Sequence, residues 1–166
     1  MRAEKNEMEL KFDAISENEA FARIAVAAFV THLNPTMEEL ADIKTAVSEA
    51  VTNSIIHGYE NWQKDALTRG LSGEKSSEVP LIWIKCRLER NILHIIVEDK
   101  GKGIADIEKA MEPLYTTKPE MGRSGMGFSF MEAFMDDVEV ESVVGEGTIV
   151  RMTKKIGLDS WIADGE

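Results

Sequence analysis

Two polar residues one helical turn apart could hold a general base and a metal ion on the same helix. Glu49 and Asn53 have the spacing Glu-x-x-x-Asn in a segment whose apolar residues recur with a helical period. A carboxylate can take up a proton, and an amide oxygen can coordinate Mg²⁺. A solvated polar face is the ordinary explanation of such a pair, but Ala46 and Ala50 beside it leave room for another group to approach. The pair is therefore a candidate for catalysis.

A strand-end aspartate and two glycines form the second motif, Asp99-x-Gly101-x-Gly103. The carboxylate of Asp99 could accept a hydrogen bond from an exocyclic amine such as that of adenine. The glycines permit a tight turn and the close approach of a ring. An ordinary strand-to-helix loop has the same residue types, so the motif indicates a base-binding site only in combination with others.

Two further glycine pairs lie downstream. The stretch Gly-Met-Gly at 125–127 opens a predicted helix, whose first N–H groups and dipole favour an anion, and Lys118 and Arg123 precede it. The stretch Gly-Glu-Gly-Thr at 145–148 lies in a predicted hairpin, where a simple turn is the alternative. The Walker and dinucleotide fingerprints do not occur. In this order, the four motifs predict a site for ATP with Mg²⁺.

Composition and charge predict one soluble domain. The chain has 166 residues, 43% of them hydrophobic, which favours a single domain with a sizeable core. Its formal net charge of −11, from 19 basic and 30 acidic residues, argues against non-specific binding to nucleic acid. The charged N-terminal stretch lacks the apolar core of a signal peptide, and no apolar run approaches the ~20 residues of a membrane span. We therefore expect a cytoplasmic protein.

The periodicity of apolar residues predicts the elements that must position these motifs. Alternation with period two predicts strands at about 8–12, 82–88, 93–99, 138–143 and 148–152. Capping boxes that begin at Ser16 and Thr36 predict helices over about 17–33 and 37–57, and shorter helices are expected at about 105–111 and 125–135. The fold class is α+β: a two-layer sandwich of one mixed, mostly antiparallel sheet with helices on one face.

The domain boundaries follow from the same pattern. We expect a single domain over 1–155 and a flexible tail over 156–166. Within the domain, the segment from about 59 to 80 is polar, rich in glycine and serine, and lacks clear periodicity. It is predicted to be a long mobile surface loop, with a helical turn around 62–67. Loops of this length are uncommon in a small domain, so the segment is either a functional appendage or an inserted linker.

The four motifs, in this order, resemble those of the GHKL ATPases, a superfamily that includes gyrase, Hsp90, histidine kinases and MutL. The helix with Glu49 and Asn53 looks like their N box, Asp99-x-Gly101-x-Gly103 like the G1 box, and the glycines at 125–127 like the G2 box. Four longer stretches, at 16–23, 49–59, 113–120 and 123–132, resemble the sporulation anti-sigma F factors, which are serine kinases. The segment 59–80 is longer than the connection typical of that family.

The resemblance implies a Bergerat-type ATP-binding fold, ATP and Mg²⁺ as cofactors, and a homodimer with two protein partners. It implies that the protein holds a sporulation sigma factor inactive and phosphorylates a serine of an anti-anti-sigma factor, with no direct contact to nucleic acid or membrane. Glu49 would be the base, Asn53 the Mg²⁺ ligand, and Arg23 a residue for partner docking. The implied catalytic residues are Glu49 and Arg123, and the implied nucleotide-binding residues are Asn53, Asp99, Gly101, Gly103, Thr116, Thr117, Lys118, Gly125, Met126, Gly127 and Thr148.

Two alternatives stay open. One is the related general-stress switch kinase, with the same chemistry and a different sigma factor. The other is an ATP-gated binding module without kinase activity, against which Glu49 argues, because a protein that only binds need not keep a base beside the metal ligand.

Overall fold

The computed structural model describes residues 5–72, 78–113 and 127–157 as one sheet with helices on one face. The five strands have the order β1-β2-β3-β5-β4, and each neighbouring pair is antiparallel. Their bounds are Lys5–Asp13 (β1), Leu81–Glu89 (β2), Ile92–Asp99 (β3), Asp137–Val143 (β4) and Gly147–Lys155 (β5). The predicted α+β class is confirmed, although the described strands pair in an antiparallel manner throughout and form no mixed sheet.

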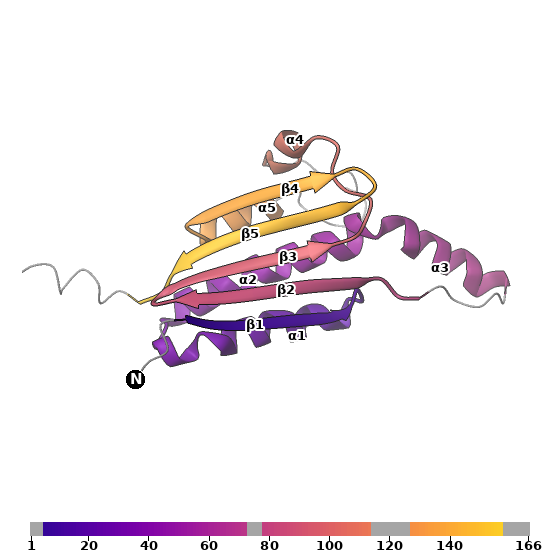
Figure 1. Ribbon diagram of the computed structural model, residues 1–166. Helices are drawn as coiled ribbons and strands as arrows, with labels where there is room; N and C mark the ends of the chain where they lie inside the picture. The colour runs from indigo at the N-terminus through magenta and orange to yellow at the C-terminus, as the bar shows by residue number, and fades with distance from the viewer. Residues whose placement is uncertain (1–4, 73–77, 114–126, 158–166) are drawn as a thin grey trace, which may run out of the picture.

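The described helices are α1 (Glu17–Phe29), α2 (Met37–Asn53), α3 (Glu60–Ser72), α4 (Ile107–Met111) and α5 (Gly127–Phe134), with a 3-10 turn at Thr31–Leu33 and a π-helical turn at Ser54–Gly58. Helices α1, α2 and α5 cover the sheet, and α2 lies between the other two (Figure 1). The core forms where Ile43, Val47 and Val51 of α2 pack on the sheet, and all three are fully buried. Within the described segments, no helix is long and apolar enough to cross a membrane.

One of the two predicted capping boxes forms. At the start of α2, the Thr36 hydroxyl accepts a hydrogen bond from the Glu39 backbone N–H at 3.0 Å, and the Glu39 carboxylate accepts one from the Thr36 N–H at 2.8 Å. The prediction at Ser16 is wrong, because its backbone is already helical and its side chain makes no capping bond. Glu19, the expected partner, instead binds Arg23 and Ser48.

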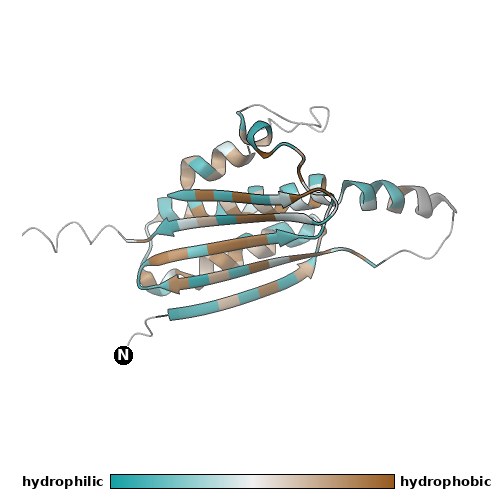
Figure 2. Cartoon of the chain, turned by 45° about the horizontal axis from the view of Figure 1, so that its top comes forward, coloured by the Kyte–Doolittle hydropathy of each residue, from teal (hydrophilic) through white to brown (hydrophobic). Residues whose placement is uncertain are grey.

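The segment after α2 is the main correction to the predicted elements. In place of a long loop, the chain forms helix α3 over Glu60–Ser72, which extends beyond the end of the sheet (Figure 1). Figure 2 shows its first turns as almost wholly hydrophilic, so the helix lacks the apolar stripe that would have revealed it in the sequence. An i,i+4 ion pair between Glu60 and Lys64 at 2.6 Å and the packing of half-buried Trp62 against the core support the helix.

The first two residues of the predicted tail are held by the domain. Ile156 is buried, and its backbone N–H donates to the Asn91 carbonyl at 2.8 Å. The N–H of Gly157 donates to the Glu39 carboxylate at 2.9 Å. The prediction of a flexible chain from 156 onward is therefore wrong for these two residues, and 158–166 lie outside the described residues.

The two capping sites provide a matched test of the fold. Thr36→Ala should lower the free energy of unfolding by about 1 kcal/mol, because it removes a capping bond that the structure contains. Ser16→Ala should change it by only a few tenths of a kcal/mol, about the usual effect of a surface substitution. Urea unfolding followed by circular dichroism measures both, and equal losses for the two variants would contradict the assignment.

Candidate functional site

The side chains of Glu49 and Asn53 converge on the first residue of helix α5. A Cβ placed on Gly127 would lie 3.2 Å from Oε2 of Glu49 and 3.2 Å from Nδ2 of Asn53. The N-terminal end of α5 therefore faces both polar groups, although residues 49 and 127 are far apart in the sequence. The structure thus brings two of the four predicted motifs together.

The face that carries Glu49 is not a solvated face of α2. Ala46 and Ala50, which flank it, are 0% and 1% exposed, and α2 packs against α5 on this side. Glu49 and Asn53 are themselves half-buried. A carboxylate and an amide held at a helix–helix contact match a binding or catalytic role better than a solubilising one.

Asp99, at the end of β3, is a buried carboxylate with several hydrogen-bond donors. Only 4% of the residue is exposed. Its carboxylate accepts hydrogen bonds from the Ser54 hydroxyl at 2.8 Å, from the Gly101 N–H at 2.9 Å and from the N–H of Thr148. Burial raises the pKa of Asp99, and these three hydrogen bonds to the ionised form oppose the rise.

A single turn of π-helix links Asp99 to the Glu49–Asn53 pair. Ser54 directly follows Asn53 and begins the turn, whose hydrogen bond from the Tyr59 N–H to the Ser54 carbonyl spans five residues. Such turns are frequent at functional sites. Ser54 was not among the predicted site residues. Its place on the buried stripe of the helix is the sequence signal that could have pointed to it, because a buried hydroxyl needs a partner.

The glycines of the 99–103 loop are required by contacts within the protein. A Cβ on Gly101 would lie 2.1 Å from the Gly58 carbonyl oxygen, and one on Gly103 would lie 2.3 Å from the Val143 carbonyl oxygen. From the sequence alone, this space was expected to receive a bound ring. In the structure, backbone of the turn at Gly58 and of the β4–β5 hairpin takes the space and holds the loop between them.

The β4–β5 hairpin completes the site. Thr148 pairs with Asp99 across β5 and β3, is 8% exposed, and shares a 2.8 Å hydrogen bond with the Ser142 hydroxyl. A Cβ on Gly147 would lie 2.0 Å from the Asp99 carbonyl oxygen, so the second glycine of this motif is also a packing requirement. The hairpin therefore does more than turn the chain, since it supports the backbone of the predicted base-binding residue.

The donor set at this end of the sheet fits a nucleotide with a divalent cation. A carboxylate has about four lone-pair positions, and three donors to Asp99 are described, which leaves an acceptor for an exocyclic amine. The oxygens of Glu49 and Asn53 are of the type that Mg²⁺ prefers. The described residues contain no cluster of three or more His, Cys, Asp or Glu side chains that could hold a metal. A cation here would thus need ligands beyond the described side chains, such as phosphate oxygens.

Several predicted site residues cannot be placed in this geometry. Six predicted site residues lie outside the described residues: Thr116, Thr117, Lys118, Arg123, Gly125 and Met126. Arg23 is described and lies on α1, where its guanidinium donates to the Glu19 carboxylate at 3.0 Å. Arg23 therefore belongs to a different part of the surface from the 99–103 loop.

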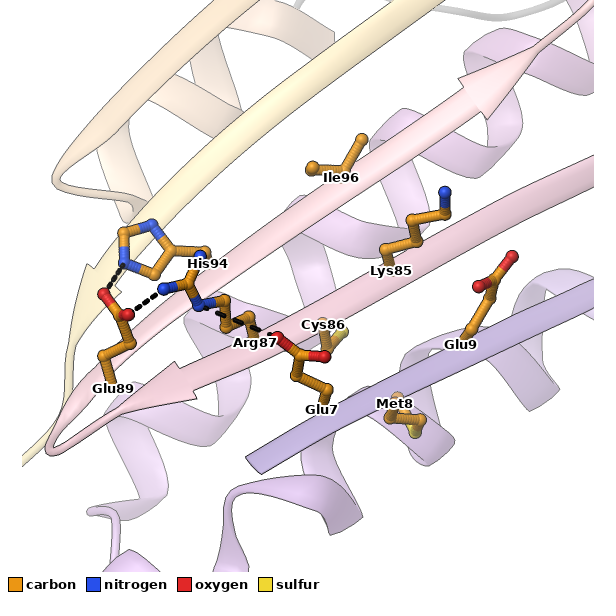
Figure 3. A pocket seen from close by; sticks show the side chains of 9 residues that line it. All are labelled: Glu7, Met8, Glu9, Lys85, Cys86, Arg87, Glu89, His94 and Ile96. Carbon is orange, nitrogen blue, oxygen red and sulfur yellow. Dashed lines mark hydrogen bonds and ion pairs between the residues drawn. The ribbon is translucent and has the colours of Figure 1, made fainter. Parts of the chain in front are cut away.

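A separate groove lies on the face of the sheet that no helix covers (Figure 3). Its volume is about 580 Å³, and its lining includes the charged side chains Glu7, Glu9, Lys85, Arg87 and Glu89. Many of these charges are already paired, as Arg87 is with Glu7 and with Glu89. None of the described motif residues lines this groove, which is distinct from the site described above.

Comparison with known proteins agrees with this geometry. A family model for the histidine kinase-like ATPase domain matches residues 12–154. A protein of Thermoanaerobacter sp. (strain X514) named anti-sigma F factor is 56% identical over 154 residues, which are 93% of this chain and 96% of the relative. Proteins of the same name from Oceanobacillus iheyensis and Bacillus licheniformis are 55% and 50% identical over 152 residues. This chain belongs to the anti-sigma F factor family of histidine kinase-like ATPases.

A more distant structure supports the fold of this anti-sigma F factor family member. The solved RsbU and RsbW domains of a Mycobacterium tuberculosis protein superpose with a TM-score of 0.60 at 16% sequence identity. The match covers 91% of this chain and 32% of that longer one. At this identity the likeness concerns the arrangement of sheet and helices alone.

Steric exclusion at Gly101 gives a first prediction for the site. Gly101→Ala should lower the free energy of unfolding by about 1–3 kcal/mol, because the new methyl group must displace backbone at Gly58. Gly145→Asn is the control, since its Cβ meets nothing within 4 Å and asparagine tolerates the φ of +84° there. Urea unfolding compares the two, and wild-type stability in Gly101→Ala would show that the close contact does not exist.

The hydrogen bond from Ser54 to Asp99 predicts a pH effect on nucleotide binding. An amine of the ligand binds more strongly to the ionised carboxylate than to the neutral acid, so binding should weaken as acid protonates Asp99. Burial already raises the pKa of this group, and Ser54→Ala should raise it further by removing a donor to the ionised form. Nucleotide affinity measured from pH 4 to pH 8 should fall at a higher pH in Ser54→Ala than in the wild type.

The same pKa shift fixes the sign of a stability effect in the nucleotide-free protein. Because the pKa of Asp99 is higher in the folded than in the unfolded state, its stabilising contribution is full below the unfolded pKa and is lost as the pH rises through the folded pKa.

The binding prediction for Ser54→Ala has a clear contradicting outcome. If nucleotide affinity falls at the same pH in Ser54→Ala and in the wild type, Ser54 does not stabilise the ionised form of Asp99 that binds the ligand.

Proposed function

We propose that this protein is an ATP-dependent anti-sigma factor that inhibits a sporulation sigma factor and phosphorylates a serine of an anti-anti-sigma factor. Membership of the anti-sigma F factor family supports the first part of the proposal. The observation that carries the second is the convergence of the Glu49 carboxylate and the Asn53 amide on Gly127 at the start of α5. A binding-only protein would not require a carboxylate beside the amide.

In the proposed reaction, Glu49 accepts the proton of the attacking seryl hydroxyl. The seryl oxygen forms a bond to the γ-phosphorus, the bond from that phosphorus to the β–γ bridging oxygen breaks, and ADP leaves with the bridging oxygen. Asn53 would hold Mg²⁺, which when bound neutralises charge on the phosphate oxygens. Arg123 would add positive charge near the γ-phosphate. Phosphoryl transfer of this kind depends mainly on positioning and charge stabilisation.

Partner binding in this proposal involves a different surface. Arg23 lies on α1 with 41% of its side chain exposed, and Glu19 orients its guanidinium. A guanidinium fixed in this way can bind a carboxylate of a partner in a bidentate manner. We propose that Arg23 docks the sigma factor and the anti-anti-sigma factor, and that the protein acts as a homodimer.

A kinase assay tests the role of Glu49. Mixed with Mg-ATP and its anti-anti-sigma partner, the wild type should transfer phosphate to one serine. Glu49→Gln should reduce transfer by at least 100-fold, the lower end of what general base catalysis contributes, and should keep nucleotide binding. Phosphate transfer is followed by mass spectrometry of the partner, and nucleotide binding by calorimetry.

Glu38→Gln provides the matched control for this assay. Glu38 lies on the same helix but is exposed at its first turn, so its loss should leave transfer unchanged. Normal transfer by Glu49→Gln would remove the proposed base. ATP-dependent sigma-factor binding without any transfer by the wild type would favour the ATP-gated binding module instead.

A further inference from the structure

Glu60, the first residue of helix α3, binds the 99–103 loop, which carries the predicted adenine-binding residue Asp99. The Glu60 carboxylate binds the Lys102 ammonium through Oε2 at 2.5 Å and the Lys64 ammonium through Oε1 at 2.6 Å. Lys102 lies between the two glycines of the 99–103 loop, three residues after Asp99. The ion pair therefore connects the segment that follows α2 directly to the loop that carries the predicted adenine-binding residue.

The backbone of Lys102 is hydrogen bonded through both its N–H and its carbonyl. The Lys102 N–H donates to the Gly58 carbonyl at 2.8 Å, and the Lys102 carbonyl accepts from the Gly145 N–H at 2.7 Å. The Tyr59 hydroxyl accepts from the Lys100 N–H at 2.8 Å and donates to the Leu81 carbonyl at 2.5 Å. Tyr59 and Glu60 thus hold consecutive parts of the loop from the same side.

The two partners of Glu60 differ in what they can do. The Glu60 side chain is only 13% exposed, whereas those of Lys102 and Lys64 are 40% and 65% exposed. The Lys64 pair joins two residues of α3 and supports the helix. The Lys102 pair joins residues 42 positions apart. Because the Glu60 carboxylate is largely shielded, solvent and salt weaken this ion pair less than they would weaken a pair of fully exposed groups.

Other described contacts of α3 also lie near its start. Gln63 donates to the Ile55 carbonyl at 2.7 Å, and Trp62 packs against the core, both in the first turn. Beyond that turn the helix runs outward, and Leu67 is 76% exposed. The contacts of Glu60 and its neighbours therefore fix both the loop and the base of the helix.

We propose that Glu60 is a positioning residue for nucleotide binding, which acts by holding Lys102 and with it the 99–103 loop. The inference rests on the proposed nucleotide site. Asp99 can accept a hydrogen bond from the ligand only where the loop places its carboxylate, and the Glu60–Lys102 pair restricts that loop before the ligand arrives. Because coupling between two sites is reciprocal, a bound nucleotide also stabilises the base of α3.

Calorimetric titration with Mg-ATP and Mg-ADP tests the proposal. Glu60→Gln and Lys102→Gln should each weaken binding about two- to fivefold, the range that a partly exposed ion pair allows. The double variant should be no weaker than either single variant, since both remove the same interaction. The reversed pair, Glu60→Lys with Lys102→Glu, should recover affinity to within about twofold of the wild type, and the single effects should shrink in 0.5 M salt.

Lys64→Gln is the matched control, because it removes the other partner of Glu60 and should leave affinity unchanged. A role of the Glu60 carboxylate that does not involve Lys102 would not be rescued by charge reversal. Wild-type affinity in Glu60→Gln, or additive losses in the double variant, would overturn the proposal while leaving the nucleotide site intact. Failure of the unchanged protein to bind either nucleotide would instead overturn the proposed function, and this inference with it.

Discussion

The backbone of the 99–103 loop passes so close to Gly58 that no side chain fits between them, and the arrangement of the site depends on this contact. A Cβ on Gly101 would lie 2.1 Å from the Gly58 carbonyl oxygen, which is itself hydrogen bonded to the next residue of the loop. The β4–β5 hairpin presses on the loop from the other side through Val143 and Gly147. The position of Asp99 therefore follows from backbone packing before any ligand is considered.

Helix α2 and the turn that follows it contact both ends of the site, namely the start of α5 and Asp99. Glu49 and Asn53 face α5 through the regular part of the helix, where buried alanines allow close packing. The π-helical turn that follows then brings the Ser54 hydroxyl onto Asp99. One continuous segment thus carries the proposed base and the proposed metal ligand and contacts the carboxylate that we propose binds adenine. A change in the packing of α2 should therefore alter both the Glu49–Asn53 pair and the contact with Asp99.

Periodicity and motif spacing predicted much of this arrangement, because the elements involved have one buried face. The strands and α2 alternate or repeat clearly, and the core buries residues of their predicted apolar faces, such as Ile84, Ile95 and Val47. The failures have physical causes. The described core contact of α3 is that of Trp62 in its first turn, and its sequence lacks a clear apolar stripe. Ser16 lies in helical backbone and makes no capping bond. The partners of Gly101 and Lys102 come from distant segments, which local sequence patterns do not reveal.

One acidic residue of this acidic chain, Glu60, forms an ion pair with the 99–103 loop. Lys102 is a basic residue of the 99–103 loop, and the carboxylate that binds it comes from the segment that was expected to be a long mobile surface loop with one helical turn. The helix that follows α2 is thus part of the surroundings of the site. Its effect on the nucleotide would be exerted through the loop, without a described contact to Glu49 or Asn53.

A crystal structure of the protein with Mg²⁺ and a non-hydrolysable ATP analogue would test the central claim most directly. The account predicts the adenine amine within hydrogen-bond distance of the Asp99 carboxylate, Mg²⁺ at the Asn53 side-chain oxygen, and Glu49 facing the γ-phosphate. A nucleotide bound in the groove on the uncovered face of the sheet, or one that makes no contact with Asp99, would contradict it.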